Sequence, residues 1–419
     1  MKFRLISKHG DALALAHRID QEGETVDFWV KDARAKPSYK GILPQKAAWN
    51  LGLTKDTFVF FDMVGMGGLA ENLKKGNFNL YGAGKLNDTL ELNREFGMKM
   101  AKTCGLKVPK YKTFKSFDKA IEYTAENGGA WVFKPQNNKS PAYTYVSVDT
   151  DDMVEMLEYF KGIWQGPVAF ILQEKIDGVE VSVEGFYIDG QLVPQSLNST
   201  IECKKFMDGD KGENTGCQGS VVWFWRKKDP KLYRLSLRKA EPFLRRFKYS
   251  GPLDCNCIVS AKDQMPYFLE WTARFGYSAI YALSEGLNCK VGDFIAGLAA
   301  GDPPKLRPSY DWLGAVRVSV PPYPHDKGLE KSANKPIRGI DNFDHIWLLD
   351  AKQDKDRLVT AGVDGVVCEV TARNRDLTAL GRELYGRIDK LKIPDKQYRS
   401  DIITDGSGRI QKLREWRYF

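Results

Sequence analysis

The order of strands and helices in the first eighty residues limits the fold of this chain more than any other feature. Apolar strand-like runs alternate with amphipathic helical segments, which predicts a sheet of parallel strands. The expected strands are 3–6, 26–30, 58–61 and 79–81, with helical segments at 12–19 and before Lys75. Residues 1–88 are therefore expected to form a small doubly wound α/β domain.

The middle of the chain has a different pattern, in which strands also follow one another through tight turns. Residues 181–188 and 191–194 are joined by Asp189-Gly190, a pair that favours a two-residue hairpin. Other expected strands are 131–134, 168–173, 256–260 and 267–271, and expected helices are 90–102, 117–126 and 231–247. This α+β pattern predicts a second unit at 89–300, with a small lid at about 107–175.

A proline-containing stretch at 301–308 is the best candidate for a linker. Beyond it, strands are expected at 316–320, 346–349, 358–361 and 365–371, and a helix at 377–390. Residues 309–419 are therefore expected to form a β-rich C-terminal domain.

Composition excludes several classes of protein. Lys and Arg number 63 against 54 Asp and Glu, and the net charge of +9 is spread along the chain, so nucleic acid is an unlikely main partner. The 7 cysteines lack a framework of close spacings, which favours free thiols in a reducing cytoplasm. No apolar run approaches the roughly 18 residues of a membrane span. We expect a folded cytoplasmic protein that does not enter a membrane.

Two segments point to chemistry. Residues 208–219 read DGDKGENTGCQG, which predicts a glycine-rich acidic turn, and residues 268–277 read FLEWTARFGY, which predicts a buried strand ending in a carboxylate and a guanidinium. An enzyme that makes an acyl phosphate from ATP needs one element for its substrate and another for metal and phosphates. The pair therefore indicates an ATP-dependent ligase.

These segments resemble those of the phosphoribosylamine–glycine ligase family, ATP-grasp enzymes of purine biosynthesis. The family's acidic turn runs GDxDxGPNTGGMG. Residues 173–194, QEKIDGVEVSVEGFYIDGQLVP, are similar to the family's EEFLDGEEASFIVMVDGEHVLP, and the run from Leu358 to Ile402 is also similar. The resemblance covers nearly the full length.

The resemblance implies an ATP-grasp fold with an N-terminal Rossmann-like pre-ATP-grasp domain, a mobile lid and a C-terminal β-rich domain. It also implies a monomer that uses ATP to join glycine, or another small carboxylate, to phosphoribosylamine or an analogous amine. ADP and phosphate are the expected by-products.

For the nucleotide, the resemblance implies that main-chain groups of Glu174 and Ile176 read adenine. Glu180 is expected to accept bonds from the ribose hydroxyls, since a carboxylate suits two adjacent donors. Lys134 and Arg94 occupy the positions of phosphate-binding cations. The alternative for Glu180, Lys134 and Arg94 is an ordinary solvated charge on a strand or helix.

For the metal, Mg²⁺ or Mn²⁺, the best ligand is Glu270, because a carboxylate on a buried strand is costly without a cation. Thr272 stands where the family has asparagine, and Asn256 is a candidate for a further oxygen. Arg274 is expected to meet the transferred phosphate; an ion pair with Glu270 or Glu285 is the alternative.

For the substrates, Asp208 and Asp210 are expected to hold an ammonium group. Asn214, Thr215 and the amides after Gly216 are expected to hold a carboxylate or an oxyanion. Arg274, Asp210 and Asn214 make up the expected catalytic group.

The chain departs from the family where substrates are bound. The family's GxGGREHA is replaced by SKHGDALA at residues 7–14. Gly65, Gly67 and Gly68 can either cradle a phosphate of the substrate, with Gly67 as its ligand, or form a simple tight turn. The loop at 135–140 lacks the family's glycines, and Lys139 can supply charge there.

Within the acidic turn, Glu213, Cys217 and Gln218 replace smaller or different family residues beside the expected amino-acid pocket. Two alternatives to the glycine and phosphoribosylamine reaction follow. One is a divergent ligase that joins another amino acid to another amine, such as a modified nucleotide. The other is a relative that binds nucleotide without turnover.

Overall fold

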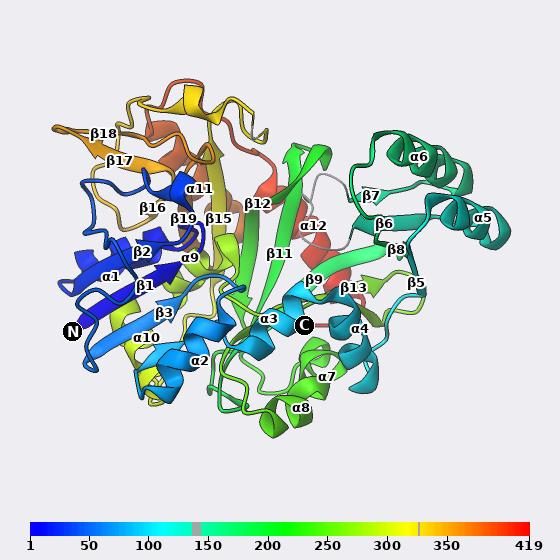
Figure 1. Cartoon of the computed structure of the whole chain (residues 1–419), viewed down its shortest axis with the longest axis horizontal. Helices are drawn as coiled ribbons and strands as arrows, with labels where there is room; N and C mark the ends of the chain where they lie inside the picture. The colour runs from blue at the N-terminus through cyan, green and yellow to red at the C-terminus, as the bar shows by residue number, and fades with distance from the viewer. Residues whose placement is uncertain (136–143, 326) are drawn as a thin grey trace.

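The computed structural model describes residues 1–135, 144–325 and 327–419. Its N-terminal part is a parallel sheet, as the sequence predicts, with four strands in the order β2-β1-β3-β4 (Figure 1). Its elements are β1 (Lys2–Ser7), α1 (Leu13–Gln21), β2 (Thr25–Val30), the short helix η1 (Ala33–Ala35), β3 (Thr57–Phe61), α2 (Gly67–Lys75) and β4 (Leu80–Tyr81).

The single helix predicted at 90–102 is wrong. Two helices, α3 (Lys85–Leu92) and α4 (Arg94–Thr103), meet at Asn93, whose side chain accepts a hydrogen bond from the backbone N–H of Phe96. Asparagine at this position caps the start of a helix, so the chain changes direction without a proline or glycine.

The lid is a separate four-stranded antiparallel sheet, ordered β5-β8-β6-β7, with two helices packed on it (Figure 1). Its elements are β5 (Tyr111–Phe114), α5 (Phe117–Asn127), β6 (Trp131–Pro135), β7 (Tyr145–Val146), α6 (Thr150–Ile163) and β8 (Phe170–Glu174). It has its own core, in which the ring of Phe117 stacks on those of Phe133 and Phe170.

The centre of the molecule is a nine-stranded antiparallel sheet in the order β14-β13-β9-β11-β12-β15-β19-β16, with β10 paired to β9. Its strands are β9 (Gly178–Ile188), β10 (Gln191–Leu192), β11 (Asn198–Met207), β12 (Lys211–Phe224), β13 (Gly251–Ser260), β14 (Pro266–Thr272), β15 (Trp312–Ser319), β16 (Ile346–Leu348) and β19 (Val366–Asn374). The β9–β10 hairpin is confirmed, and Asp189 and Gly190 both have positive φ, as its turn requires.

The acidic segment 208–219 is only partly a turn. Residues 208–210 turn the chain, and the rest belongs to β12, which pairs with β11 with two register shifts. The helix predicted at 231–247 is also wrong in extent, because the backbone of Ser236 leaves the helical conformation and Pro242 lies in the first turn of a new helix. The segment divides into α7 (Lys231–Leu235), η3 (Leu237–Ala240) and α8 (Glu241–Arg246).

The sheet continues across the predicted boundary at residue 309, because β12 pairs with β15. Residues 301–308 connect α10 to β15 without helix or strand, and the division into three domains stays a prediction. The remaining elements are α9 (Tyr277–Gly286), α10 (Val291–Ala300), η4 (Leu329–Ser332), β17 (Ala351–Asp354), β18 (Arg357–Thr360), α11 (Leu377–Lys390) and α12 (Ile402–Glu415).

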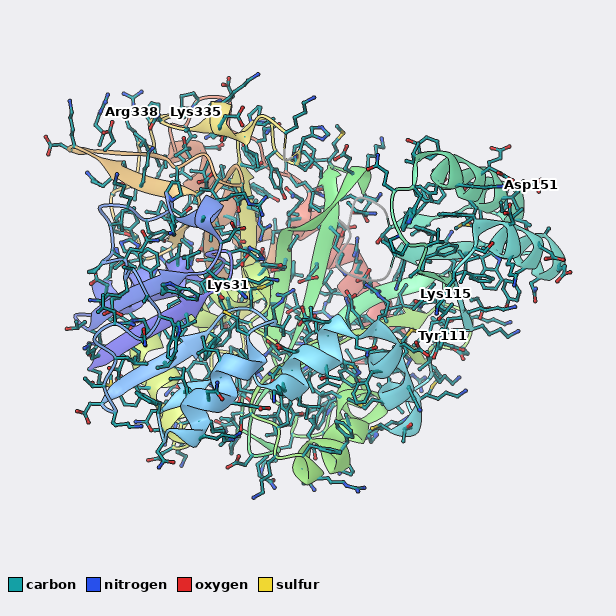
Figure 2. All side chains as sticks on the ribbon, viewed as in Figure 1. Lys31, Tyr111, Lys115, Asp151, Lys335 and Arg338 are labelled. Atoms are coloured by element: carbon teal, nitrogen blue, oxygen red, sulfur yellow. The ribbon has the colours of Figure 1, made fainter. Side chains whose placement is uncertain are left out.

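Charged side chains cover all parts of the molecule, as Lys115 and Asp151 on the lid and Lys335 and Arg338 near the C-terminal strands show (Figure 2). Among the helices of the described residues, none combines the length and apolar character that crossing a bilayer requires.

Candidate functional site

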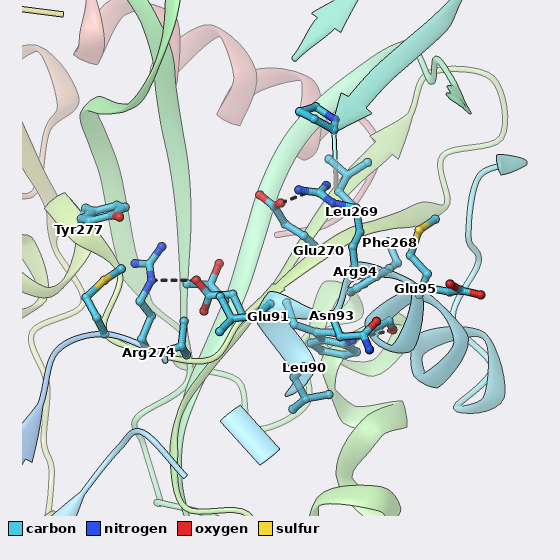
Figure 3. A pocket seen from close by; sticks show the side chains of 18 of the residues that line it. Leu90, Glu91, Asn93, Arg94, Glu95, Phe268, Leu269, Glu270, Arg274 and Tyr277 are labelled. Atoms are coloured by element: carbon cyan, nitrogen blue, oxygen red, sulfur yellow. Dashed lines mark hydrogen bonds and ion pairs between the residues drawn. The ribbon is translucent and has the colours of Figure 1, made fainter. Parts of the chain in front are cut away.

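A cleft of about 830 Å³ opens between the N-terminal sheet, the α3–α4 junction and β14 (Figure 3). This volume is typical of a site for a small molecule. Its walls include Lys8 and Met63 from loops that follow parallel strands, Arg94 from α4, and Glu270 and Arg274 from the end of β14. The cleft thus lies at the carboxyl ends of parallel strands, where ligands of open α/β sheets bind.

Glu270 is the centre of charge in this cleft. Burial alone would raise its pKa, but Lys204, Arg94 and Lys134 together hold the pKa of Glu270 at about 2. Arg94 Nη1 lies 3.8 Å and Lys204 Nζ 3.9 Å from its carboxylate oxygens. Glu270 is therefore ionised at every physiological pH and surrounded by cations.

Lys204 is a site residue that the sequence reasoning missed. Its Nζ lies 2.6 Å from Glu180 Oε1, and Glu180, Glu270 and Glu202 raise its pKa against the effect of burial. A signal was available, since Thr200, Glu202 and Lys204 alternate along β11 and so share one face of the sheet.

Glu180 lies on the site as predicted, but its carboxylate is already engaged. Besides the bond from Lys204, its Oε1 accepts a bond from Asn256 Nδ2 at 3.0 Å. Burial raises the pKa of Glu180 and Lys204 lowers it, and the net direction is downward. Its assignment to the ribose stays a prediction.

Lys134 lies near the end of β6 in the lid, and its ammonium group interacts electrostatically with Glu270. Burial and the nearby Arg94 lower its pKa to about 8, while Glu270 and Glu180 oppose that shift. An amine in this setting gains from a further anion, such as a phosphate. The structure thus brings Arg94, Lys134, Glu180 and Glu270 together, as predicted.

The adenine-binding assignment concerns the connection between the lid and the central sheet. Glu174 ends β8, and its N–H donates to the carbonyl of Lys110 at 2.8 Å. Ile176 follows in the connection to β9. Their contact with adenine stays a prediction.

Arg274 does not pair with Glu270 or Glu285. Its Nε donates to Glu91 Oε1 at 2.9 Å, and Glu91 also accepts from the backbone N–H of Ala273 (Figure 3). The guanidinium lies 4.2 Å from the centre of the Tyr277 ring. Glu91 therefore orients Arg274 in the cleft; nothing in its sequence surroundings distinguishes it from a surface helix residue.

Mg²⁺ suits the oxygen donors around Glu270. Among the described residues, no group of three or more His, Cys, Asp or Glu side chains is arranged to hold a metal ion. Mg²⁺ usually takes one or two protein carboxylates and completes its shell with phosphates and water. Glu270 provides such a carboxylate. Thr272 and Asn256 line the same small chamber as Glu270.

Asp208 and Asp210 lie away from this group and contact the C-terminal segment. Asp210 forms ion pairs of 2.7 Å with both Arg399 and Arg409. Asp208 accepts bonds from the backbone and hydroxyl of Ser400. The chain's own donors thus engage both carboxylates, and their assignment to an ammonium group gains no support.

Asn214 and Thr215 are held by neighbouring backbone groups. Asn214 Nδ2 donates to the carbonyl of Thr144 in the lid at 3.1 Å, and the Thr215 hydroxyl donates to the carbonyl of Lys204 at 2.7 Å. Gly216 lines the small chamber beside Glu270. Asn214 therefore links β12 to the lid.

In the glycine loop after β3, two of the three glycine amides expected to hold a phosphate are already engaged. The N–H groups of Gly65 and Gly67 donate to the carboxylate of Asp88 at 2.6 and 2.8 Å. The nearby Ala12 amide donates likewise to Asp62 at 3.0 Å. The carboxylate of Asp88 therefore binds two amides that were expected to hold a substrate phosphate. Lys139 lies outside the described residues.

Comparison with known proteins identifies similar sequences and folds. Residues 92–279 match the family model "Phosphoribosylglycinamide synthetase, ATP-grasp (A) domain". The phosphoribosylamine–glycine ligase of Lactococcus lactis is 26% identical over 364 residues, 84% of each chain. The crystal structure of the same enzyme from Thermotoga maritima superposes with a TM-score of 0.72 at 18% identity, covering 96% of this chain and 100% of that one.

The chain is similar to these ligases over most of its length, and residues 92–279 match their ATP-grasp domain. The ATP-grasp fold also accounts for the likeness to a biotin carboxylase from Campylobacter jejuni, solved with an ATP analogue, which superposes with a TM-score of 0.67 at 13% identity. It covers 100% of this chain and 97% of that one. The ATP-grasp fold and the mixed α/β architecture predicted from the sequence are confirmed.

Proposed function

We propose that this protein is an ATP-dependent ligase that forms an amide from a carboxylate and an amine. The observation that carries the proposal is the group around Glu270, in which Arg94, Lys134 and Lys204 surround one ionised carboxylate. Cations of this kind neutralise a triphosphate, and the Glu270 carboxylate would hold a Mg²⁺ ion that supplies further positive charge to the phosphates.

The chemistry proceeds in two steps. A carboxylate oxygen of the substrate attacks the γ-phosphorus, which forms an acyl phosphate and releases ADP. The amine nitrogen then attacks the acyl carbon, phosphate leaves, and the nitrogen loses its proton. Positioning and charge neutralisation supply most of the acceleration, and Arg274, held by Glu91, is placed to meet the transferred phosphate.

The acceptor differs from phosphoribosylamine in this proposal. Asp88 and Asp62 accept bonds from the amides of Gly65, Gly67 and Ala12, so these three amides are not available to a phosphate of the acceptor. A different amine, with glycine or another amino acid as the carboxylate, fits these loops better.

The test is ADP release from MgATP in the presence of amino acid and amine pools, with Glu270→Gln as the comparison. We expect ADP from at least one pair of pools, and its loss in the variant. ATP binding without ADP from any pair would support the alternative, a nucleotide-binding relative without turnover.

A further inference from the structure

One face of the central sheet is polar across four adjacent strands. Side chains of alternate residues share a face, and the pairing register places them opposite one another. The residues of this face are Glu270 and Thr272 on β14, Asp254 and Asn256 on β13, Glu180, Ser182 and Glu184 on β9, and Thr200, Glu202 and Lys204 on β11.

Two carboxylates are directly opposite each other on this face. Asp254 pairs with Glu184 in the β13–β9 register, two positions along the strand from the pair of Asn256 and Ser182. Like charges at such positions repel, and Glu184 is only 3% exposed. Asn198 Nδ2 donates to Glu184 at 3.1 Å, but it brings no positive charge.

A small, partly open chamber of about 80 Å³ lies against this pair. Glu184, Asp254 and Asn256 line it, together with Glu270 and Arg274, which also line the large cleft. Asn256 is 6% exposed. Among the described residues, neither its Oδ1 nor Asp254 Oδ1 has a hydrogen-bond partner. Lys204 and Arg274 also line the chamber, but neither donates to these two oxygens. The chamber thus has two buried acceptor atoms without a donor.

We propose that Glu184, Asp254 and Asn256 bind the primary ammonium group of the molecule whose carboxylate is activated. An ammonium group has three N–H donors, which match the three acceptors. The chamber has room for that group, since its volume exceeds the roughly 10–15 Å³ that a single water molecule needs. In this arrangement Glu270 serves the metal and Asn256 serves the substrate.

The assignment also separates the two nitrogen atoms of the reaction. An ammonium held by two carboxylates stays protonated, so it cannot act as the nucleophile. The group in the chamber is therefore the amino group of the activated amino acid, and the attacking amine enters from the large cleft. The identity of this group rests on the proposed function, whereas the cation site itself does not.

Thermal unfolding with simple cations tests the site without knowledge of the substrate. Methylammonium chloride is compared at equal concentration with potassium chloride and tetramethylammonium chloride. The protein is wild type, Asp254→Asn, Glu184→Gln, or the control Asp263→Asn, which removes a carboxylate from the turn between β13 and β14. MgATP affinity is measured in parallel.

We expect methylammonium to raise the unfolding temperature of the wild type and the control more than either other salt does. In Asp254→Asn and Glu184→Gln, its half-saturating concentration should rise about tenfold or more, because a charge-assisted bond is lost. MgATP affinity should change less than about twofold, since these residues lie beyond Glu270. Without added amine, both variants should be as stable as the wild type or more so, because the repulsion is removed.

Equal stabilisation by potassium, or an unchanged methylammonium response in both variants, would overturn the inference. A loss of unfolding temperature in both variants without amine would do the same, since it would indicate a proton shared for structural reasons. Failure of the ligase reaction would appear separately, as absent ADP release with an intact methylammonium response.

Discussion

Lys204 Nζ on β11 and Glu180 Oε1 on β9 lie 2.6 Å apart on the polar face of the central sheet. The same ammonium lies within 3.9 Å of Glu202 and Glu270. One lysine thus compensates three carboxylates from three strands. The charge balance of the site depends on it, because unpaired carboxylates at this depth are costly.

Lys204→Met should therefore weaken MgATP binding about tenfold or more and lower the unfolding temperature, since three carboxylates lose their shared cation. Titration calorimetry with a non-hydrolysable ATP analogue measures the first effect. Lys205→Met, at the adjacent position of the strand, is the control. Equal affinities for wild type and Lys204→Met would show that this lysine does not organise the site.

Glu270→Gln should keep the fold and lose turnover by about a hundredfold or more, because the neutral amide holds Mg²⁺ poorly. The measurement is the steady-state rate of ADP formation across a range of Mg²⁺ concentrations. Glu95→Gln, which also lines the cleft, should retain the rate. A variant with wild-type magnesium dependence would remove Glu270 from the metal site.

Asp210→Asn should destabilise the protein by about 1–2 kcal/mol, because two arginines lose a charged partner. The KM for the amino-acid substrate should not change, since Asp210 pairs with Arg399 and Arg409 rather than with a ligand. Urea unfolding and steady-state kinetics measure the two effects. A large rise in KM with unchanged stability would restore the role expected from the sequence.

Burial, and secondarily Arg18, lowers the pKa of His17 to about 4. The unfolded chain takes up this proton near pH 6.5, so the folded state loses stability as the pH falls from about 6.5 to 4. The loss is at most about 3 kcal/mol. Its ring contacts Tyr39 and Phe343 edge-on, so His17→Phe should keep the packing and flatten this part of the pH profile. Urea unfolding measures the stability of the wild type and His17→Phe at each pH. The same pH dependence in both proteins would contradict this role of His17.

The sequence predicts the fold well where local pattern decides it. The parallel sheet, the hairpin at Asp189-Gly190 and α11 follow from periodicity and turn chemistry. The sequence-based prediction fails where a capping side chain ends a helix, as Asn93 does. It also fails where glycine and aspartate residues, which are typical of turns, lie in a strand. The start of β12 belongs to the second class, because pairing with β11 outweighs its low strand propensity.

The site is predicted in part. Four predicted residues converge as expected: Glu270, Lys134, Arg94 and Glu180. Each lies in a segment whose sequence resembles a segment of the ligase family. Their partners are not predictable in the same way. Glu91 lies 183 residues before Arg274, and Lys204 lies 24 residues after Glu180, so only the folded sheet and the α3 helix bring them together.

The fate of the substrate's carboxylate oxygen tests the acyl phosphate most directly. An amino acid pool labelled with heavy oxygen in its carboxylates is incubated with the protein, MgATP and an amine pool, and the released phosphate is analysed by mass spectrometry. We expect each phosphate to carry one heavy oxygen, because that atom joins the γ-phosphorus in the first step and leaves with it in the second. Released phosphate without heavy oxygen would contradict a reaction through an acyl phosphate.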